Sequence, residues 1–271
     1  MREKRRIGAN PPAGKEILAP PHRPPVQPPC APIRPRRKAR AMQQLDQTYD
    51  DFHGTIVTDP SQSGPRPGVL IFHSIAWRSP VEMDAAERLA SMGYAAFVAD
   101  TYGRAPEGPE DCRSLMNGLN ADRGELRRRI GAALDWMRGS GVTNGQHGAI
   151  GFCFGGKCVL DLARMGEPDV KAVASFHGLF DAPTWHVAPR ITASVLALHG
   201  WDDPLATPEN VLALSKELDA AEADWQILAM GGVGHAFTNP KAQDKAGGKQ
   251  FDARATARAW AATEGLFAAA F

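Results

Sequence analysis

The sequence predicts an α/β protein built on a mostly parallel sheet of about seven to eight strands, with helices on both faces. Two observations lead to this prediction. From residue 49 onward, short apolar runs rich in β-branched residues alternate with segments that have helical spacing, which is the pattern of repeated βαβ units. The chain also has 271 residues, which is enough for one large domain with a well-buried core.

Seven short segments have the composition of strands. The first, "FHGTIVTD" at 52–59, alternates between apolar and polar residues as an edge strand does. The second, "PGVLIFHS" at 67–74, is continuously apolar at its centre, as expected of a strand buried on both faces. The remaining strands are predicted at 94–100, 147–153, 170–178, 194–203 and 224–230.

Segments with helical spacing lie between and after these strands. The first ends at Gly93, a residue typical of helix C-termini. A later one begins with Thr207 as N-cap and Pro208 in the first turn, and the alanine-rich C-terminal helix can dock Trp260 and Phe267 on the sheet. The predicted apolar stripes are Met83, Ala86 and Ala90; Leu126, Ile130, Leu134 and Met137; and Val211, Leu214 and Leu218.

Residues 1–41 differ from the rest of the chain in composition. They hold eleven lysines and arginines, two glutamates and ten prolines, and few large apolar residues. Such a segment can neither bury a helical face nor pair as a sheet, so we expect a disordered Pro/Arg-rich extension at 1–41 and one domain at 42–271. A true translation start at Met42 would leave the same domain. A basic tail can attract polyanions, but a solvated tail without a nucleic-acid partner is the favoured interpretation.

The remaining composition indicates a cytoplasmic protein with free thiols. No window approaches the roughly 18 apolar residues of a membrane span, and no apolar h-region follows the basic N-terminus. The four cysteines, Cys30, Cys112, Cys153 and Cys158, show no CxxC pairing and no histidine spacing typical of zinc. We therefore expect no metal, no other cofactor and no membrane partner, and a monomer or homodimer.

The stretch "GAIGFCFGGK" at 148–157 places Cys153 where a predicted strand turns into a helix. A nucleophile on such a sharp turn needs small residues two positions before and after it, and Gly151 and Gly155 occupy those positions. Gly156 would let the helix pack closely on the sheet, and the helix N-terminus would favour the thiolate. The alternative is that Cys153 is a small buried apolar residue in an ordinary turn.

Two downstream motifs supply partners for this thiol in the order nucleophile, acid, histidine. "LHGWDDP" places Asp202 and Asp203 at the end of a predicted strand, and "GGVGHAF" places His235 in a glycine-rich loop after the last strand. The carboxyl ends of parallel strands meet at one edge of a sheet, so these side chains are expected to converge.

At these residues the chain resembles the dienelactone hydrolase family, the cysteine-nucleophile branch of the α/β-hydrolase superfamily. The resemblance covers about residues 49–271 and rests on the motifs GFCFGG, HGWDDP, GHAF, GYAAFVADTYGR and FDARATARAW. It implies an α/β-hydrolase fold and hydrolysis of small carboxylic esters or lactones through a thioester. Cys153 would be the nucleophile, His235 the base and Asp203 the orienting acid, because the family's acid directly precedes the residue matching Pro204.

The resemblance also implies an oxyanion hole and a substrate pocket. The backbone N–H groups of Phe154 and Ile75 would bind the oxyanion.

The pocket residues include two departures from the family. Ser74 stands where the founding members have a glutamate that helps to activate the thiol, and Asn239 stands where they have the second of two arginines that clamp the substrate carboxylate. Arg104 matches the first arginine. Trp77 and Trp201 follow strand ends on the predicted site face, where they either line the pocket wall or pack under a loop.

Two alternatives use the same fold. A catalytically degenerate hydrolase acting as a binding module would explain the missing glutamate and arginine. An acyltransferase or peptidase would use the same three residues on a different acceptor or bond.

Overall fold

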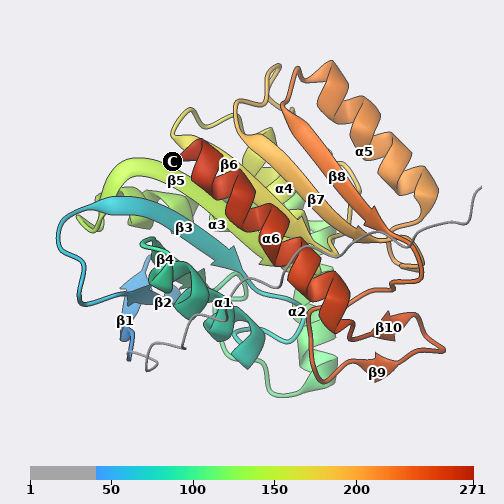
Figure 1. The fold of residues 1–271 in the computed structure, drawn as a ribbon, viewed down its shortest axis with the longest axis horizontal. Coiled ribbons are helices and arrows are strands. Elements are labelled where there is room, and N and C mark those ends of the chain that lie inside the picture. Colours follow the sequence, from blue (N-terminus) through green and yellow to red (C-terminus); the bar gives the residue numbers. More distant parts are fainter. Residues whose placement is uncertain (1–40) are drawn as a thin grey trace, which may run out of the picture. The chain divides into compact units, whose positions relative to one another are not determined.

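The loops that leave the strands of one eight-stranded sheet carry most of the predicted site residues. A computed structural model describes residues 41–271, so the extension predicted at 1–41 lies outside the described residues except for Ala41. The strands are β1 (Gln43–Tyr49), β2 (Phe52–Thr58), β3 (Arg66–Phe72), β4 (Ala95–Ala99), β5 (Thr143–Phe152), β6 (Val170–Phe176), β7 (Ser194–Gly200) and β8 (Trp225–Met230). Their order is β1-β2-β4-β3-β5-β6-β7-β8 (Figure 1).

The sheet is antiparallel only at one side. β2 pairs antiparallel with both β1 and β4, and every other pair of neighbours in this sheet is parallel. In the parallel part, Phe72 of β3 lies opposite Gly151 of β5, and Phe152 lies opposite Phe176 of β6. The ends of these three central strands therefore lie side by side. The predicted mostly parallel sheet is confirmed.

Helices cover both faces of the sheet. α1 (Pro80–Ser91) and α6 (Ala253–Ala270) lie on one face (Figure 1), where they pack on alternate strand residues such as Val69 and Ile71. α3 (Arg123–Gly139), α4 (Phe154–Arg164) and α5 (Pro208–Ala220) pack on the other set, which includes Leu70 and Phe72. Trp260 and Phe267 of α6 are buried, as predicted. Within residues 41–271, every helix is too short or too polar to span a bilayer.

Two predictions about the elements are wrong. The strand predicted at 52–59 as an edge strand is β2, which lies one place inside, and β1 forms the edge. The sequence of β1, QQLDQTY, is mostly polar and exposed, so it lacks an apolar signal. No helix was predicted at 109–121, but these residues form α2 (Pro109–Ala121), which has only one buried residue, Leu119, and so lacks an apolar stripe. A short hairpin of β9 (Gln243–Asp244) and β10 (Lys249–Gln250) was not predicted either.

Candidate active site

Cys153 lies on a strained turn between β5 and α4. Its backbone has φ 55° and ψ −112°, a conformation that side chains other than glycine rarely adopt. A Cβ atom at Gly151 would lie 2.0 Å from the carbonyl oxygen of Gly155. A Cβ atom at Gly155 would lie 2.0 Å from the carbonyl oxygen of Phe72. The prediction that both positions need glycine is confirmed.

The first turn of α4 is packed against the end of β6. A Cβ atom at Gly156 would lie 2.6 Å from the Cα atom of Gly178 and 2.8 Å from Ser175 Oγ, so glycine is required for this packing as predicted. The Cys153 N–H donates to the carbonyl oxygen of Phe176 at 3.0 Å. Phe154 is the first residue of α4, and its N–H therefore has no acceptor within the helix.

A buried acid–base pair lies near the thiol. His235 Nδ1 is 2.7 Å from Asp203 Oδ2, and the other oxygen of Asp203 accepts from the Leu205 N–H at 2.8 Å. Asp202 is exposed. The structure therefore pairs Asp203, and not its neighbour, with the histidine.

The charge state of His235 follows from its surroundings. Burial disfavours the imidazolium, but the hydrogen bond to Asp203 and the interaction with the Cys153 sulfur outweigh it, and they raise the pKa of His235 to about 9. Its Nε2 atom is buried and forms no hydrogen bond within residues 41–271. Asp203 and the Cys153 sulfur therefore favour the imidazolium form of His235 at neutral pH.

A cavity of about 390 Å³ opens onto Cys153 and His235. Three further predicted residues, Ser74, Ile75 and Asn239, lie on its wall. Apolar side chains from α2 and from the loops after β6 and β7 complete part of the wall, namely Met116, Leu179 and Leu205. The cavity has the size and mixed lining expected of a small-molecule site.

Three predicted pocket residues do not line this cavity. Arg104 forms two hydrogen bonds with Asp111 of α2, at 2.6 and 2.7 Å, and is held away by this pair. Trp77 packs against the core, and its Nε1–H donates to Asp100 at 3.0 Å. Trp201 is exposed at the surface beside His199. In this structure the three side chains make other contacts, and their role in binding substrate stays a prediction.

Three charged residues on the cavity wall were missed. Arg113 comes from α2 and Lys249 from β10, and neither forms an ion pair or a side-chain hydrogen bond with any described residue. Both elements were unpredicted, so the two cations could not be placed. Glu82 of α1 also lies on the wall and is fully buried. Its sequence signal was the pattern Ser79-x-x-Glu82 at the start of a helix, which is common and does not indicate a cavity.

Two further histidines, His177 and His73, are buried and hydrogen bonded. His177 hydrogen bonds to Thr238 through Nε2 at 2.8 Å, and its ring centre lies 5.0 Å from that of His235. Burial, and then the charge of His235, hold the pKa of His177 well below its usual value. His73 hydrogen bonds to the carbonyl oxygen of Ser74 and to Thr101. These contacts give both residues a structural role.

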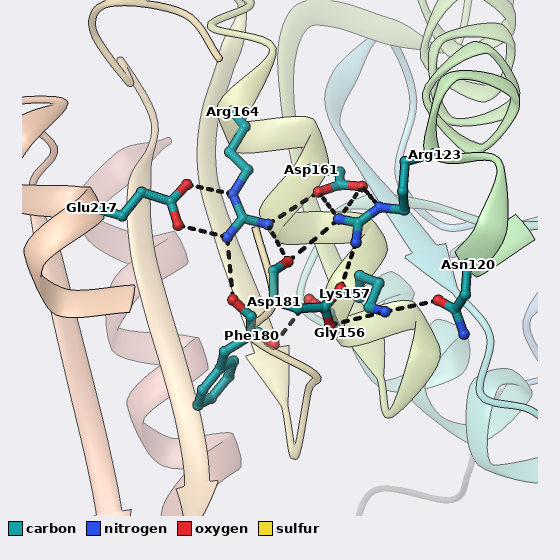
Figure 2. Close-up of polar contacts among 10 residues, drawn as sticks. Asn120, Arg123, Gly156, Lys157, Asp161, Arg164, Phe180, Asp181 and Glu217 are labelled. Carbon is teal, nitrogen blue, oxygen red and sulfur yellow. Dashed lines mark hydrogen bonds and ion pairs between the residues drawn. The ribbon is translucent and has the colours of Figure 1, made fainter. Parts of the chain in front are cut away.

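A buried ionic network holds α4 in place (Figure 2). Asp161, fully buried in the middle of α4, accepts hydrogen bonds from Arg123 of α3 and from Arg164 one turn along α4. Arg164 in turn donates to Glu217 of α5 at 2.6 and 2.8 Å. The helix that begins at the candidate nucleophile is therefore tied to both neighbouring helices.

The same network reaches the cavity wall. Lys157, one turn after Cys153, donates to Asn120 of α2 and forms an ion pair with Asp181 at 2.9 Å (Figure 2). Asp181 lies two residues after Leu179, which lines the cavity. The segment after β6 is thus fixed to the helix of the nucleophile.

Comparison with known proteins places this arrangement in a family. The family model described as "Dienelactone hydrolase family" matches residues 52–271. The chain belongs to the dienelactone hydrolase family. Its membership accounts for the α/β-hydrolase fold and identifies the protein as a dienelactone hydrolase-like hydrolase.

Individual members of the dienelactone hydrolase family are similar over most of the chain. The solved structure of m3DLH is 34% identical, with a TM-score of 0.80, and covers 86% of this chain and 100% of its own. P91, a dienelactone hydrolase-like promiscuous phosphotriesterase from metagenomic libraries, is 37% identical, with a TM-score of 0.78 over 85% of this chain and 98% of its own. A "Putative carboxymethylenebutenolidase" of Aquifex aeolicus (strain VF5) is 27% identical over 81% of this chain and 94% of its own.

Proposed function

We propose that this protein hydrolyses small carboxylic esters or lactones, with Cys153 as nucleophile, His235 as general acid and base, and Asp203 as the orienting acid. One observation carries the proposal. A buried Asp203–His235 pair lies close enough to Cys153 for the sulfur to raise the histidine pKa, and both Cys153 and His235 border one cavity. This is the arrangement that nucleophilic acyl transfer requires.

The acylation step forms a bond between the Cys153 sulfur and the substrate carbonyl carbon. The carbonyl oxygen becomes an oxyanion, which the N–H groups of Phe154 and Ile75 would stabilise. When the tetrahedral intermediate collapses, the bond to the alcohol oxygen breaks, and His235 gives its proton to the leaving alkoxide. A thioester on Cys153 and a neutral imidazole remain.

The deacylation step uses water as the nucleophile. Neutral His235 takes a proton from water through Nε2, and the oxygen attacks the thioester carbon. The carbon–sulfur bond then breaks, which releases the carboxylic acid and restores the thiolate beside the imidazolium. Asp203 keeps Nδ1 protonated throughout, so that Nε2 faces the reaction.

The cavity also indicates which esters fit best. Arg113 and Lys249 face it without a partner among the described residues, and Arg104 is occupied by Asp111. An ester or lactone that carries its own carboxylate would find these two cations, in place of the single arginine, Arg104, that the resemblance implied.

Substitution of the nucleophile and the base tests the proposal. Cys153→Ala and His235→Ala are each expected to lower the turnover of p-nitrophenyl acetate and of dienelactone by at least about a thousandfold. Cys158→Ala, which removes a buried thiol from the same helix, is the matched control and should retain turnover. Wild-type turnover in either site variant would refute the assignment. Absence of turnover in the native protein, with an unreactive Cys153, would instead favour the binding module.

Phosphotriesters are a second candidate substrate class. The similarity to P91, whose name records promiscuous phosphotriesterase activity, favours them. The same sulfur would attack phosphorus and displace an aryloxide. Release of p-nitrophenol from diethyl p-nitrophenyl phosphate, and its loss in Cys153→Ala, tests this activity.

A further inference from the structure

Glu82 is a fully buried carboxylate on the cavity wall, and it has no cationic partner among the described residues. Its two oxygens instead accept hydrogen bonds from donors on two sides. One oxygen, Oε1, accepts from the Ser74 N–H at 3.0 Å. The other, Oε2, accepts from the Ser79 N–H at 2.9 Å and from the Ser79 hydroxyl. Burying a carboxyl group is costly unless it is well hydrogen bonded, so its placement calls for an explanation.

The contacts of Oε2 with Ser79 are a common feature of helices. Ser79 is the N-cap of α1 and Glu82 its third residue, and the two form a capping box. That role explains the contacts of Oε2. It does not explain the contact of Oε1, which reaches eight residues back along the chain to the loop that follows β3.

The loop that Oε1 contacts contains the proposed oxyanion donor. Ser74 begins a turn in which its carbonyl oxygen accepts from the Trp77 N–H at 3.2 Å and from His73 Nδ1 at 2.7 Å. In a trans peptide the N–H points opposite to the carbonyl, so fixing the Ser74 carbonyl fixes the direction of the Ile75 N–H. Ile75 is the second residue of this turn, and its N–H has no acceptor within the turn.

Both peptide groups beside this N–H are therefore held. The peptide group before Ser74 is held because its N–H donates to Glu82. The peptide group after Ile75 is held because its carbonyl oxygen accepts from the Tyr102 hydroxyl at 3.2 Å. Preorganised donors stabilise an oxyanion because they need not reorient during the reaction.

We propose that Glu82 is a positioning residue that holds the loop at 74–77 so that the Ile75 N–H faces the oxyanion. This inference rests on the proposed function. The positioning role requires two acceptor oxygens at residue 82, because one must accept from the Ser74 N–H and the other from the Ser79 N–H. Glutamine has the same size but one oxygen, so its NH₂ group would face either Ser74 N–H or Ser79 N–H, and one contact would be lost.

Two reactions of the same sulfur separate positioning from general effects on the thiol or the fold. Acylation of Cys153 by p-nitrophenyl acetate passes through an oxyanion. Alkylation by iodoacetamide forms a sulfur–carbon bond and releases iodide from a saturated carbon, so it develops no oxyanion. The ratio of the two second-order rate constants reports on the oxyanion hole and cancels changes in thiolate reactivity.

Glu82→Gln is expected to lower this ratio by about tenfold to a hundredfold, somewhat less than loss of an oxyanion donor itself. Ser79→Ala is the matched control. It removes the cap hydroxyl but leaves the Ser74 contact, so it should lower the melting temperature and keep the wild-type ratio. If Glu82→Gln does not fold, Glu82→Asp, too short to reach both donors, is expected to lower the ratio in the same way.

The result that overturns the inference is a wild-type ratio in the Glu82 variant, including the case in which acylation and alkylation fall together. A wild-type protein whose Cys153 is alkylated but never acylated by the ester has a different meaning. It would refute the proposed hydrolase activity, and the positioning role with it.

Discussion

Replacement of Asp203 by asparagine is expected to change how the stability of this protein depends on pH. In the native protein, burial disfavours the imidazolium of His235, but Asp203 and Cys153 outweigh it and raise its pKa from 6.5 to about 9. Because one pKa unit corresponds to about 1.4 kcal/mol, the imidazolium contributes up to about 3 kcal/mol to the free energy of unfolding.

The sign follows from linkage. The folded protein binds the His235 proton more tightly than the unfolded chain does, so this stabilisation is fully present below pH 6.5 and disappears as pH rises through about 9. Asparagine can still accept from Nδ1 but carries no charge, so most of the shift should vanish. The stability difference between the native protein and Asp203→Asn should therefore be largest near pH 6 and smaller by up to about 3 kcal/mol at pH 10.

Chemical denaturation at pH 6, 8 and 10 measures this difference. Both proteins would carry Cys153→Ala, which removes the titration of the thiol and makes about 3 kcal/mol an upper bound. Other titrating groups are common to the two proteins and cancel. A difference in unfolding free energy that stays constant from pH 6 to pH 10 would show that Asp203 does not control the charge of His235.

Three further predictions follow from single contacts. Gly155→Ala, whose methyl group would meet a backbone carbonyl at 2.0 Å, should destabilise the protein by at least about 2 kcal/mol in denaturant titrations, whereas Gly118→Ala, with nothing within 4 Å, should be neutral or stabilising. Asp161→Asn should cost about 1.5 to 3 kcal/mol because it removes the buried charge that Arg123 and Arg164 share and leaves them only Asp181 and Glu217; an unchanged unfolding midpoint would contradict this. Arg113→Ala and Lys249→Ala should each raise KM about tenfold for an ester that carries a carboxylate, and leave KM for its neutral methyl ester unchanged.

The parts of the fold that could be predicted are those whose signal is local. Seven of the strands and five helices have apolar patterns or caps that lie within a few residues of each other in the sequence. The glycine frame of Cys153 is also local, because the clash at Gly151 comes from Gly155, four residues away. β1 and α2 lack such a pattern: β1 is held by backbone pairing to β2, and α2 buries only Leu119.

The cavity wall was harder to predict, because its side chains are placed by contacts between distant segments. Arg104 follows the end of a strand, which is where a pocket residue is expected. However, its guanidinium is bound by Asp111 on the unpredicted helix α2. Lys249 reaches the cavity because β10 forms an isolated bridge with His235, a pairing that no sequence pattern indicates. The three proposed catalytic residues lie far apart in the chain, yet each follows a parallel strand, so topology alone brings them to one edge.

Ser74 shows why a residue-by-residue comparison can misjudge a site. The sequence comparison reads this position as the loss of a carboxylate, since serine replaces the glutamate of the founding members. In the structure a carboxylate does contact the Ser74 backbone, but it belongs to Glu82, one turn into the next helix. Under our proposal for Glu82, the loop needs an acceptor for the Ser74 N–H, and a side chain in the first turn of α1 supplies it. Serine at position 74 would then be compatible with a loop that stays fixed, whereas the thiol activation attributed to the founding glutamate is a separate function.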